Sequence, residues 1–354
     1  MAVYTTIDDP SAFFQTALYT GTGSTQSITN DGNSDLQPDW VWVKKRDAAE
    51  SNALADSSRG TSATLFSDLN NQESSSSQVV NSFNSDGFQV GTEGVVNDNT
   101  NTYVAWQWKA GGGTTSTNSD GDINSTVQVN STAGFSIITD SPGNNTARTI
   151  GHGLGAKPDF IIRRARNRTE DWCVYHSAFE STLPGGFQGL NTTAAYNDSA
   201  TTLFTSVSNT TFGVGTDFGV NGGFNYVTYA FKEVQGYSKF GKYIGNGNSD
   251  GPFIYTGFKP AFIMTKRSDT AGYHWRIYDA KRNPFNIVNA RLSANNNDAE
   301  YSGTSGNEHC DFLSNGWKWK TNASDQNVDG GTYIYMAFAE NPFVTSNGIP
   351  TTAR

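Results

Sequence analysis

The sequence predicts an all-β protein built from three tandem β-sandwich-like (jelly-roll-like) units. One pattern occurs three times in the 354 residues: a Pro-led apolar strand, basic residues at its end, and later an aromatic closing strand. Pro38, Pro158 and Pro260 begin the copies, so each copy is roughly 100–120 residues long, well above the ~20–50 residues of a solenoid repeat. Aromatic residues make up 13% of the chain, charged residues only 16%, and glycine occurs 37 times. This composition favours strands joined by many turns over helical bundles.

We divide the chain at changes in composition and at the ends of the repeats. The segments are an N-terminal arm (1–17), unit one (18–110), a Gly/Thr/Ser-rich linker (111–134), unit two (135–236), unit three (237–345) and a C-terminal tail (346–354). The middle of the linker alternates enough to form a hairpin or an added edge strand. Units two and three are joined by a short aromatic segment, 236–240, which indicates a packed interface between them.

The Pro-led strands are apolar on both faces. The runs are Trp40-Val41-Trp42-Val43, Phe160-Ile161-Ile162 and Phe262-Ile263-Met264. Because side chains alternate between faces, such strands must be covered on both sides. We expect them either at the centre of a sandwich with a second layer or at a subunit contact. The leading proline is expected near the first residue of the strand, where its missing N–H costs nothing.

The closing strands have one large apolar face and one mixed face. The large faces are Val104, Trp106, Trp108; Val227, Tyr229, Phe231; and Ile334, Met336, Phe338. Small residues on the mixed face, such as Ala105 and Ala230, would let another strand or subunit approach closely. Trp-x-Trp pairs could instead form a stacking platform for sugars, but they coincide with positions that are hydrophobic in every repeat. The expected core residues are therefore Trp40, Trp42, Trp106, Trp108, Phe160, Phe231, Phe262, Trp317 and Phe338.

Turns and variable loops punctuate each unit. Asp86-Gly87 and Asn315-Gly316 are strong hairpin signals because both pairs readily supply a positive φ, and unit two has Thr210-Thr211 at the matching place. Three polar stretches differ between the units, at 70–78, 185–202 and 295–308. We expect these stretches to be exposed loops, where any recognition would lie.

Basic residues follow each Pro-led strand. They are Lys44, Lys45, Arg46, Arg163, Arg164, Lys266 and Arg267. The first interpretation is that each strand emerges into solvent there, since exposed charged pairs contribute little to stability. Their recurrence in all three units leaves a second interpretation, in which they contact an acidic partner.

Charge and hydropathy exclude several classes of protein. The net charge is −9 with no basic tract, which argues against nucleic-acid binding. Residues 1–8 have neither the basic nor the apolar segment of a signal peptide, and no apolar run approaches the ~20 residues of a membrane span. We therefore expect assembly in a cytoplasm and no membrane insertion. Cys173 and Cys310 lie in different repeats and are expected to be buried free thiols.

No motif indicates catalysis, a cofactor or a metal. The histidines lack metal-ligand spacing, and the serine-hydrolase elbow, the zinc-protease helix motif and the phosphate-binding loop are all missing. Two carboxylates at a suitable separation would suffice for a glycosidase, but no acid occupies an obvious cleft position in all three units. We predict that the protein is not an enzyme and has no catalytic residue, cofactor or metal, and a glycan-binding or glycan-cleaving module is the alternative.

Four longer runs carry a family resemblance. They are 151–162 (GHGLGAKPDFII), 251–258 (GPFIYTGF), 311–317 (DFLSNGW) and 331–340 (GTYIYMAFAE). Together they resemble a family of virion structural proteins of tailed bacteriophages, of the type common in marine and cyanobacterial phages, over about residues 18–345. That family consists of tail or fibre-like proteins of poorly defined function, and it supplies no catalytic residues.

The resemblance implies a structural protein of the virion. We expect an outer tail component, a fibre or appendage that contributes to host attachment, and the alternative structural role is a capsid decoration protein. The expected partners are other virion proteins and a glycan or protein of the host surface. A homotrimer is also expected, because phage appendages are usually trimeric and because the Pro-led strands need cover on both faces.

Overall fold

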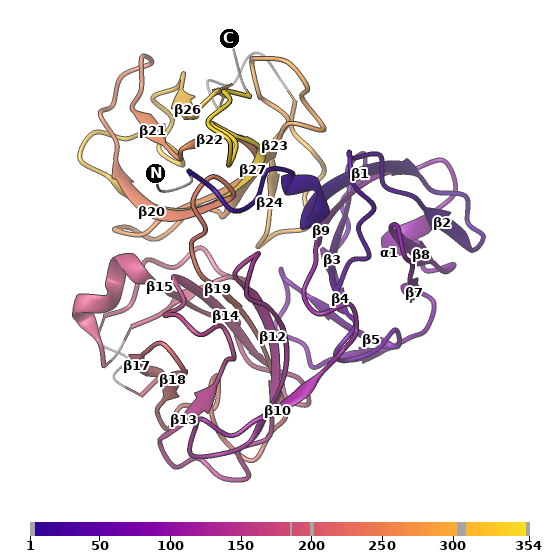
Figure 1. Cartoon of the computed structure of the whole chain (residues 1–354), viewed down its shortest axis with the longest axis vertical. Helices are drawn as coiled ribbons and strands as arrows, with labels where there is room; N and C mark the ends of the chain where they lie inside the picture. The colour runs from indigo at the N-terminus through magenta and orange to yellow at the C-terminus, as the bar shows by residue number, and fades with distance from the viewer. Residues whose placement is uncertain (1–3, 185, 199–201, 303–308, 352–354) are drawn as a thin grey trace.

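Apolar strands and Gly-rich turns give an almost entirely β structure. The computed structural model describes residues 4–184, 186–198, 202–302 and 309–351, with 41% of residues in strands and 4% in helices. The strands form separate antiparallel sheets that are grouped into three lobes, one for each unit, around a common centre (Figure 1). The all-β, sandwich-type fold class is therefore confirmed.

Unit one consists of a large inner sheet and a small outer sheet. The inner sheet has the order β1 (Phe14–Thr20), β9 (Thr102–Trp108), β3 (Trp40–Lys45), β4 (Ala53–Asp56), β5 (Ala63–Phe66) and β6 (Ser74–Ser75). The outer sheet is β2 (Gln26–Ile28), β8 (Phe88–Val90) and β7 (Val80–Phe83). A 3-10 helix, η1 (Pro10–Ala12), precedes β1, and a short helix, α1 (Gly94–Asn97), precedes β9. Because β1 begins at Phe14, unit one starts inside the segment that the sequence assigned to the arm.

Units two and three repeat this arrangement. The inner sheet of unit two is β10 (Ser116–Asn118), β11 (Ser125–Asn130), β12 (Phe135–Asp140), β19 (Tyr226–Phe231), β14 (Phe160–Ala165), β15 (Cys173–His176) and β16 (Gln188–Gly189), and its outer sheet is β13 (Arg148–Gly151), β18 (Thr211–Val214) and β17 (Phe204–Val207). The helix η2 (Ser177–Thr182) follows β15. In unit three the inner sheet is β20 (Ser238–Ile244), β27 (Thr332–Pro342), β22 (Phe258–Arg267), β23 (Arg276–Asp279) and β24 (Leu292–Ser293), and the outer sheet is β21 (Phe253–Tyr255), β26 (Gly316–Trp319) and β25 (Cys310–Leu313).

The segment 111–134 contains the expected hairpin: β10 and β11 pair with each other and extend the inner sheet of unit two beyond β12. One detail differs from the expected layout. Pro260 lies inside β22 and not at its start, at a point where the pairing of β22 with β27 shifts register. A proline is tolerated at such an irregularity because no regular ladder bond is lost there.

Each inner sheet is buried on both faces, which explains the doubly apolar Pro-led strands. One face packs on the outer sheet of its own unit, with Val41, Ile161 and Ile263 in three separate cores. The opposite faces of all three inner sheets meet in one central core, which contains Trp40, Trp42, Trp106, Trp108, Phe160, Phe231, Phe262 and Phe338. Trp317 lies in the core of unit three. All nine expected core residues are at most 1% exposed, so none is available as a stacking platform for sugars.

Aromatic contacts across the central core join the units. The Trp40 ring stacks on Tyr229 of unit two with ring centroids 4.3 Å apart, and Phe14 stacks on Phe338 of unit three at 5.2 Å. Phe240, in the join between units two and three, lies 5.9 Å from Phe160. The cover that the sequence assigned to a subunit contact therefore comes from the same chain, and the covered strands no longer argue for a homotrimer.

Candidate functional site

The basic residues after the Pro-led strands are mostly buried, so their interpretation as solvated strand ends is wrong. Lys44, Lys45, Arg163, Arg164 and Lys266 are 0–3% exposed, and Arg46 and Arg267 are partly buried. Burial lowers the pKa of both Lys44 and Lys266 to about 8 and that of Arg164 to about 10. Any partner contact through these side chains would first have to break contacts within the chain.

The contacts of these basic residues fall into two groups. Within a unit, Arg163 donates two hydrogen bonds of 2.7 Å to Asp140, Lys45 bonds Asp98 at 2.7 Å, Arg267 bonds Asp269 at 2.9 Å, and Lys266 donates to the Arg267 carbonyl at 2.6 Å. Between units, Lys44 donates to the Asn297 carbonyl at 3.0 Å, Arg164 to the Asn71 carbonyl at 2.6 Å, and Arg46 binds Glu300 at 2.8 Å. The second group lies at the junctions where one unit meets the next.

The variable loops supply the other side of each junction. The same backbone hydrogen bond occurs three times: Glu73 N to Arg166 O at 2.6 Å, Glu300 N to Arg46 O at 2.7 Å, and Tyr196 N to Ser268 O at 2.8 Å. The described parts of the loops 70–78, 185–202 and 295–308 therefore bind neighbouring units of the same chain. Residues 185, 199–201 and 303–308 of these loops lie outside the described residues.

Side chains at two junctions form matching charged triads. Glu73 accepts from Arg59 at 2.8 Å and from Arg166 at 2.8 Å, which joins units one and two. Glu300 accepts from Arg282 at 3.0 Å and from Arg46 at 2.8 Å, which joins units three and one. Burial alone would raise the pKa of both glutamates, but the hydrogen bonds and charges of their arginines lower it below the usual value.

The third junction has no such triad. Phe179, Tyr196 and Ser268 stand where the other junctions have arginine, glutamate and arginine. The Phe179 and Tyr196 rings stack with centroids 3.7 Å apart. At this junction all three positions of the charged triad have changed together, and a stacked aromatic pair takes the place of the ion pairs.

A buried polar group also recurs at each junction, on the strand after the Pro-led one. Asp56 accepts from the Tyr229 hydroxyl at 2.7 Å, and Asp279 accepts from the Trp106 indole at 3.0 Å. At the third junction, His176 Nδ1 accepts from the Ala178 N–H, so His176 Nε2 carries the proton and donates to the Tyr335 carbonyl at 3.1 Å. Burial lowers the pKa of His176 to about 4, which keeps it neutral.

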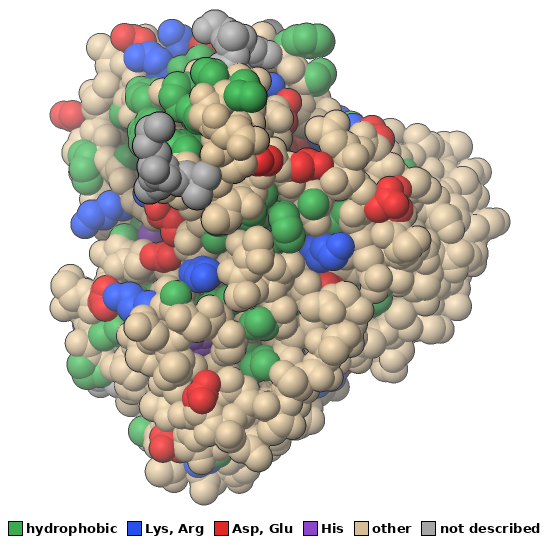
Figure 2. Space-filling view, in the orientation of Figure 1, with side chains coloured by type: hydrophobic (Ala, Val, Ile, Leu, Met, Phe, Trp, Pro, Cys, Tyr) green, Lys and Arg blue, Asp and Glu red, His purple; other side chains and the backbone are tan. Residues whose placement is uncertain are grey.

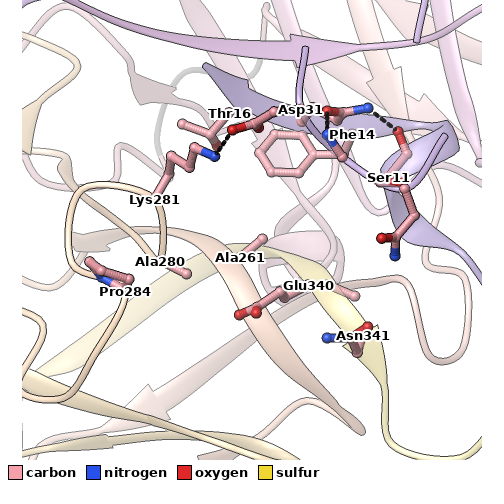
Figure 3. A pocket seen from close by; sticks show the side chains of 14 residues that line it. Ser11, Phe14, Thr16, Asp31, Ala261, Ala280, Lys281, Pro284, Glu340 and Asn341 are labelled. Carbon is pink, nitrogen blue, oxygen red and sulfur yellow. Dashed lines mark hydrogen bonds and ion pairs between the residues drawn. The ribbon is translucent and has the colours of Figure 1, made fainter. Parts of the chain in front are cut away.

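The junction between units one and three contains an open cavity of about 450 Å³, here called the junction cavity. Its walls come from β1 and the loop at 31–33 of unit one, and from β22, β27 and the turn after β23 of unit three. Figure 3 shows Lys281 extending toward Asp31 at one side of the cavity, with Glu340 and Asn341 at the other. Phe14, Thr16, Ala261, Ala280 and Ala339 also line it.

Substitutions between the units explain why the cavity is open. Thr16 pairs with Trp106 across strands, as Ile137 pairs with Tyr229 and Phe240 with Met336, so the smaller threonine stands where the other junctions have large apolar side chains. Ala261 stands where units one and two have Asp39 and Asp159. The missing volume on both walls leaves the space unfilled.

The aspartates at the position of Ala261 have a structural role. Asp39 accepts hydrogen bonds of 2.7–2.9 Å from the N–H groups of Ala110, Gly112 and Gly113, and Asp159 accepts one of 2.7 Å from Glu233 N. Each thereby ties down the turn that leads into the next part of the chain.

The outer face of unit three carries large apolar side chains, whereas the matching positions of units one and two are occupied by small or polar residues. Phe253 pairs with Lys318 across strands, as Ser27 pairs with Gln89 and Thr149 with Gly213. Phe253, Tyr255, Phe285 and Ile287 are 42–75% exposed. Figure 2 shows hydrophobic side chains gathered over unit three, at the top of the view. Large exposed apolar side chains gathered on one face are typical of interaction sites.

Other chemistry is sparse among the described residues. They contain no group of three or more His, Cys, Asp or Glu side chains placed to hold a metal, and no helix in the described ranges is long and apolar enough to cross a membrane. Cys173 and Cys310 are free and buried, and burial raises the pKa of both thiols. A buried thiol with a raised pKa is a poor nucleophile.

One family model matches the chain. Its description is a domain of unknown function, DUF7483, and it matches residues 9–342. No curated protein and no solved structure matches the chain. A single family model spans all three units. This agrees with the central core, because each unit leaves one face of its inner sheet to be covered by the other two. The chain belongs to the DUF7483 family.

Proposed function

We propose that the protein is a non-catalytic structural component of a bacteriophage virion, an outer tail component that contributes to attachment to the host surface. The runs at 151–162, 251–258, 311–317 and 331–340 support the phage assignment through their resemblance to tail and fibre-like proteins. The ionic and aromatic groups at the junctions support the non-catalytic part, because they bind one unit to the next.

The outer face of unit three is the observation that carries the proposal. Six of the nine large hydrophobic side chains that are exposed in the described residues belong to unit three. The matching outer positions of the other units carry serine, threonine and glycine, so the apolar side chains are a property of this unit and not of the repeated fold. We assign this face to docking on another virion protein, which leaves units one and two directed outward.

Incorporation into virions tests this assignment. Replacing the outer residues of unit three by those of unit one, Phe253→Ser with Tyr255→Thr, removes apolar surface at positions that solvent already reaches. The free energy of unfolding should change by no more than about 0.5 kcal/mol per site, while the copy number in purified virions should fall steeply. Phe218→Ser, on the exposed surface of unit two, is the matched control and should be incorporated normally.

Electron microscopy of labelled virions locates the protein. Label on the tail supports the proposal, and label on the head would replace it with a capsid decoration role. The absence of the protein from purified virions would contradict both. A homotrimer stays a prediction, and a stable monomer in sedimentation velocity at micromolar concentration would contradict it for the free protein.

A further inference from the structure

We infer that the junction cavity binds a neutral saccharide unit. This inference rests on the proposed role in host attachment for its biological meaning and deepens it, because it names the class of ligand. The cavity volume of about 450 Å³ lies within the ~300–1,000 Å³ of small-molecule sites.

The lining offers both donors and acceptors, as a polyhydroxyl ligand requires. The lining includes the carboxylates of Asp31 and Glu340 and the amide of Asn341. Thr16 also lines the cavity, and its hydroxyl oxygen is shielded from solvent and has no hydrogen-bond partner among the described residues. A buried hydroxyl without a partner costs free energy, and a turn of the Thr16 side chain toward the cavity would let a ligand hydroxyl satisfy it.

The lining also offers small apolar side chains beside these polar groups. Ala261, Ala280 and Ala339 carry only methyl groups, and Phe14 lines the same cavity. A sugar ring has C–H faces and a hydroxyl edge, so it matches a lining that offers methyl groups beside carboxylates and an amide.

Charge pairing selects a neutral ligand. Lys281 binds Asp31 at 2.5 Å and Lys259 binds Glu340 at 2.7 Å, so each acid at the cavity is matched by one lysine. A phosphate or an acidic sugar would need positive charge that is not already paired. A lipid chain would remove water from these ion pairs and offer no hydrogen bond in its place.

The junction between units one and two shows which chemical group occupies the position that matches the cavity. Gln128 on β11 pairs with Ile137 across strands and donates to the hydroxyls of Ser57 and Ser58 at 2.9 and 2.8 Å. Ile137 and Ser57 are the counterparts of Thr16 and Ala280, which line the cavity. A neutral group that both donates and accepts hydrogen bonds therefore fills this place where the chain supplies one.

Titration of the full chain with sugars tests the inference. The panel contains glucose, galactose and mannose with their short oligomers, glucuronate as the acidic counterpart and glucosamine as the cationic one. We expect at least one neutral sugar to bind in isothermal titration calorimetry and in saturation-transfer NMR, and glucuronate to bind at least tenfold more weakly. Preferred binding of glucuronate, or no binding by any neutral sugar at millimolar concentration, would overturn the inference.

Thr16→Ile is the decisive variant, because it installs the residue that unit two carries at this position. The added methyl group narrows the cavity and the hydroxyl is lost, so affinity for the bound sugar should fall at least tenfold. The midpoint of urea unfolding should stay equal or rise, which shows that the fold is kept. Thr20→Ile, at the exposed end of the same strand, is the matched control and should bind as the parent chain does. Unchanged binding by Thr16→Ile would place the sugar elsewhere.

The outcome separates this inference from the proposed function. Sugar binding is measured on the purified protein, whereas the virion role is measured by copy number and labelling. A protein that is incorporated into virions but binds no sugar would leave the structural role intact and remove the saccharide site. A protein that binds a sugar but is absent from virions would do the reverse.

Discussion

The two junctions of unit one and the junction between units two and three solve the same packing problem with different chemistry. All three share the same backbone hydrogen bond from the variable loop to the neighbouring unit. Two add a glutamate held between two arginines, and the third adds the stacked rings of Phe179 and Tyr196. The geometry of the junction is therefore set by the backbone and the central core, while the side chains vary together as a set.

This comparison predicts the largest effect for the buried aspartates. Asp279→Ala leaves Arg282, whose side chain is fully buried, without its main partner, and also removes the acceptor of the Trp106 indole. Breaking a buried ion pair by removing one partner costs about 3–5 kcal/mol. His176→Ala removes a neutral hydrogen-bonding group and should cost about 1–3 kcal/mol. Urea unfolding of both variants measures the difference.

An exposed acid supplies the control for these variants. Asp35→Ala, on the surface of unit one, should change the free energy of unfolding by less than about 0.5 kcal/mol. If Asp279→Ala were as mild as Asp35→Ala, the charged network would add nothing to the junction and the contrast between the two kinds of junction would disappear.

Acid should weaken the third junction first. His176 has a pKa of about 4 in the folded protein because burial disfavours its charged form, against about 6.5 in an unfolded chain. Between these values the unfolded state binds more protons, so the free energy of unfolding falls as the pH falls. One pKa unit corresponds to about 1.4 kcal/mol, so His176 should account for about 2 kcal/mol between pH 7 and pH 5.

The charged junctions respond in a lower window. The pKa values of Glu73 and Glu300 are lowered in the folded state, so their stabilisation is complete above the usual glutamate value of 4.5 and is lost as the pH falls below it.

His176→Asn should therefore flatten the loss of stability between pH 7 and pH 5. A smaller slope should persist, because burial also lowers the pKa of His152 and His274. An unchanged slope in the variant would show that the third junction is not the acid-sensitive one.

Local patterns predicted the strands, whereas their partners depend on contacts that the patterns do not encode. The alternation at Trp40 and Trp42 identifies a strand with two apolar faces, but it does not say that one of these faces meets two other units. Arg46 and Glu300 are separated by 254 positions, so a charge that looks solvated in sequence is paired and partly buried in the fold. The buried ion pairs can be recognised in the sequence only by aligning the units, since Arg59 and Arg282 each follow an aspartate by three residues.

The candidate site was less predictable than the fold. The sequence shows that unit three has Ala261 where units one and two have Asp39 and Asp159. Unit three therefore lacks the hydrogen bonds from this side chain to the following turn. Thr16 gave no signal, because it lies in the segment that was assigned to the arm and its register with Trp106 is known only from the sheet. The loops were predicted to serve recognition, but their described parts bind neighbouring units.

Exchanging a complete set of side chains should have the smallest effect. The junction between units one and two takes the residues of the third junction in the variant Asp56→His, Arg59→Phe, Glu73→Tyr, Arg166→Ser. Replacing a buried ion network by well-packed apolar groups is often neutral, so we expect a change of about 1 kcal/mol or less in the free energy of unfolding. Arg59→Phe alone should cost about 3–5 kcal/mol, because Asp56 is then buried without its cation.

The gap between the single and the fourfold variant measures how strongly the residues of one junction are coupled. Residues of one network commonly show interaction energies of 0.5–3 kcal/mol, and a set that exchanges as a whole should reach the upper end. If the fourfold variant were as unstable as Arg59→Phe, the aromatic stack would depend on surroundings that only units two and three provide. The junctions would then share a backbone geometry, but their sets of side chains could not be exchanged.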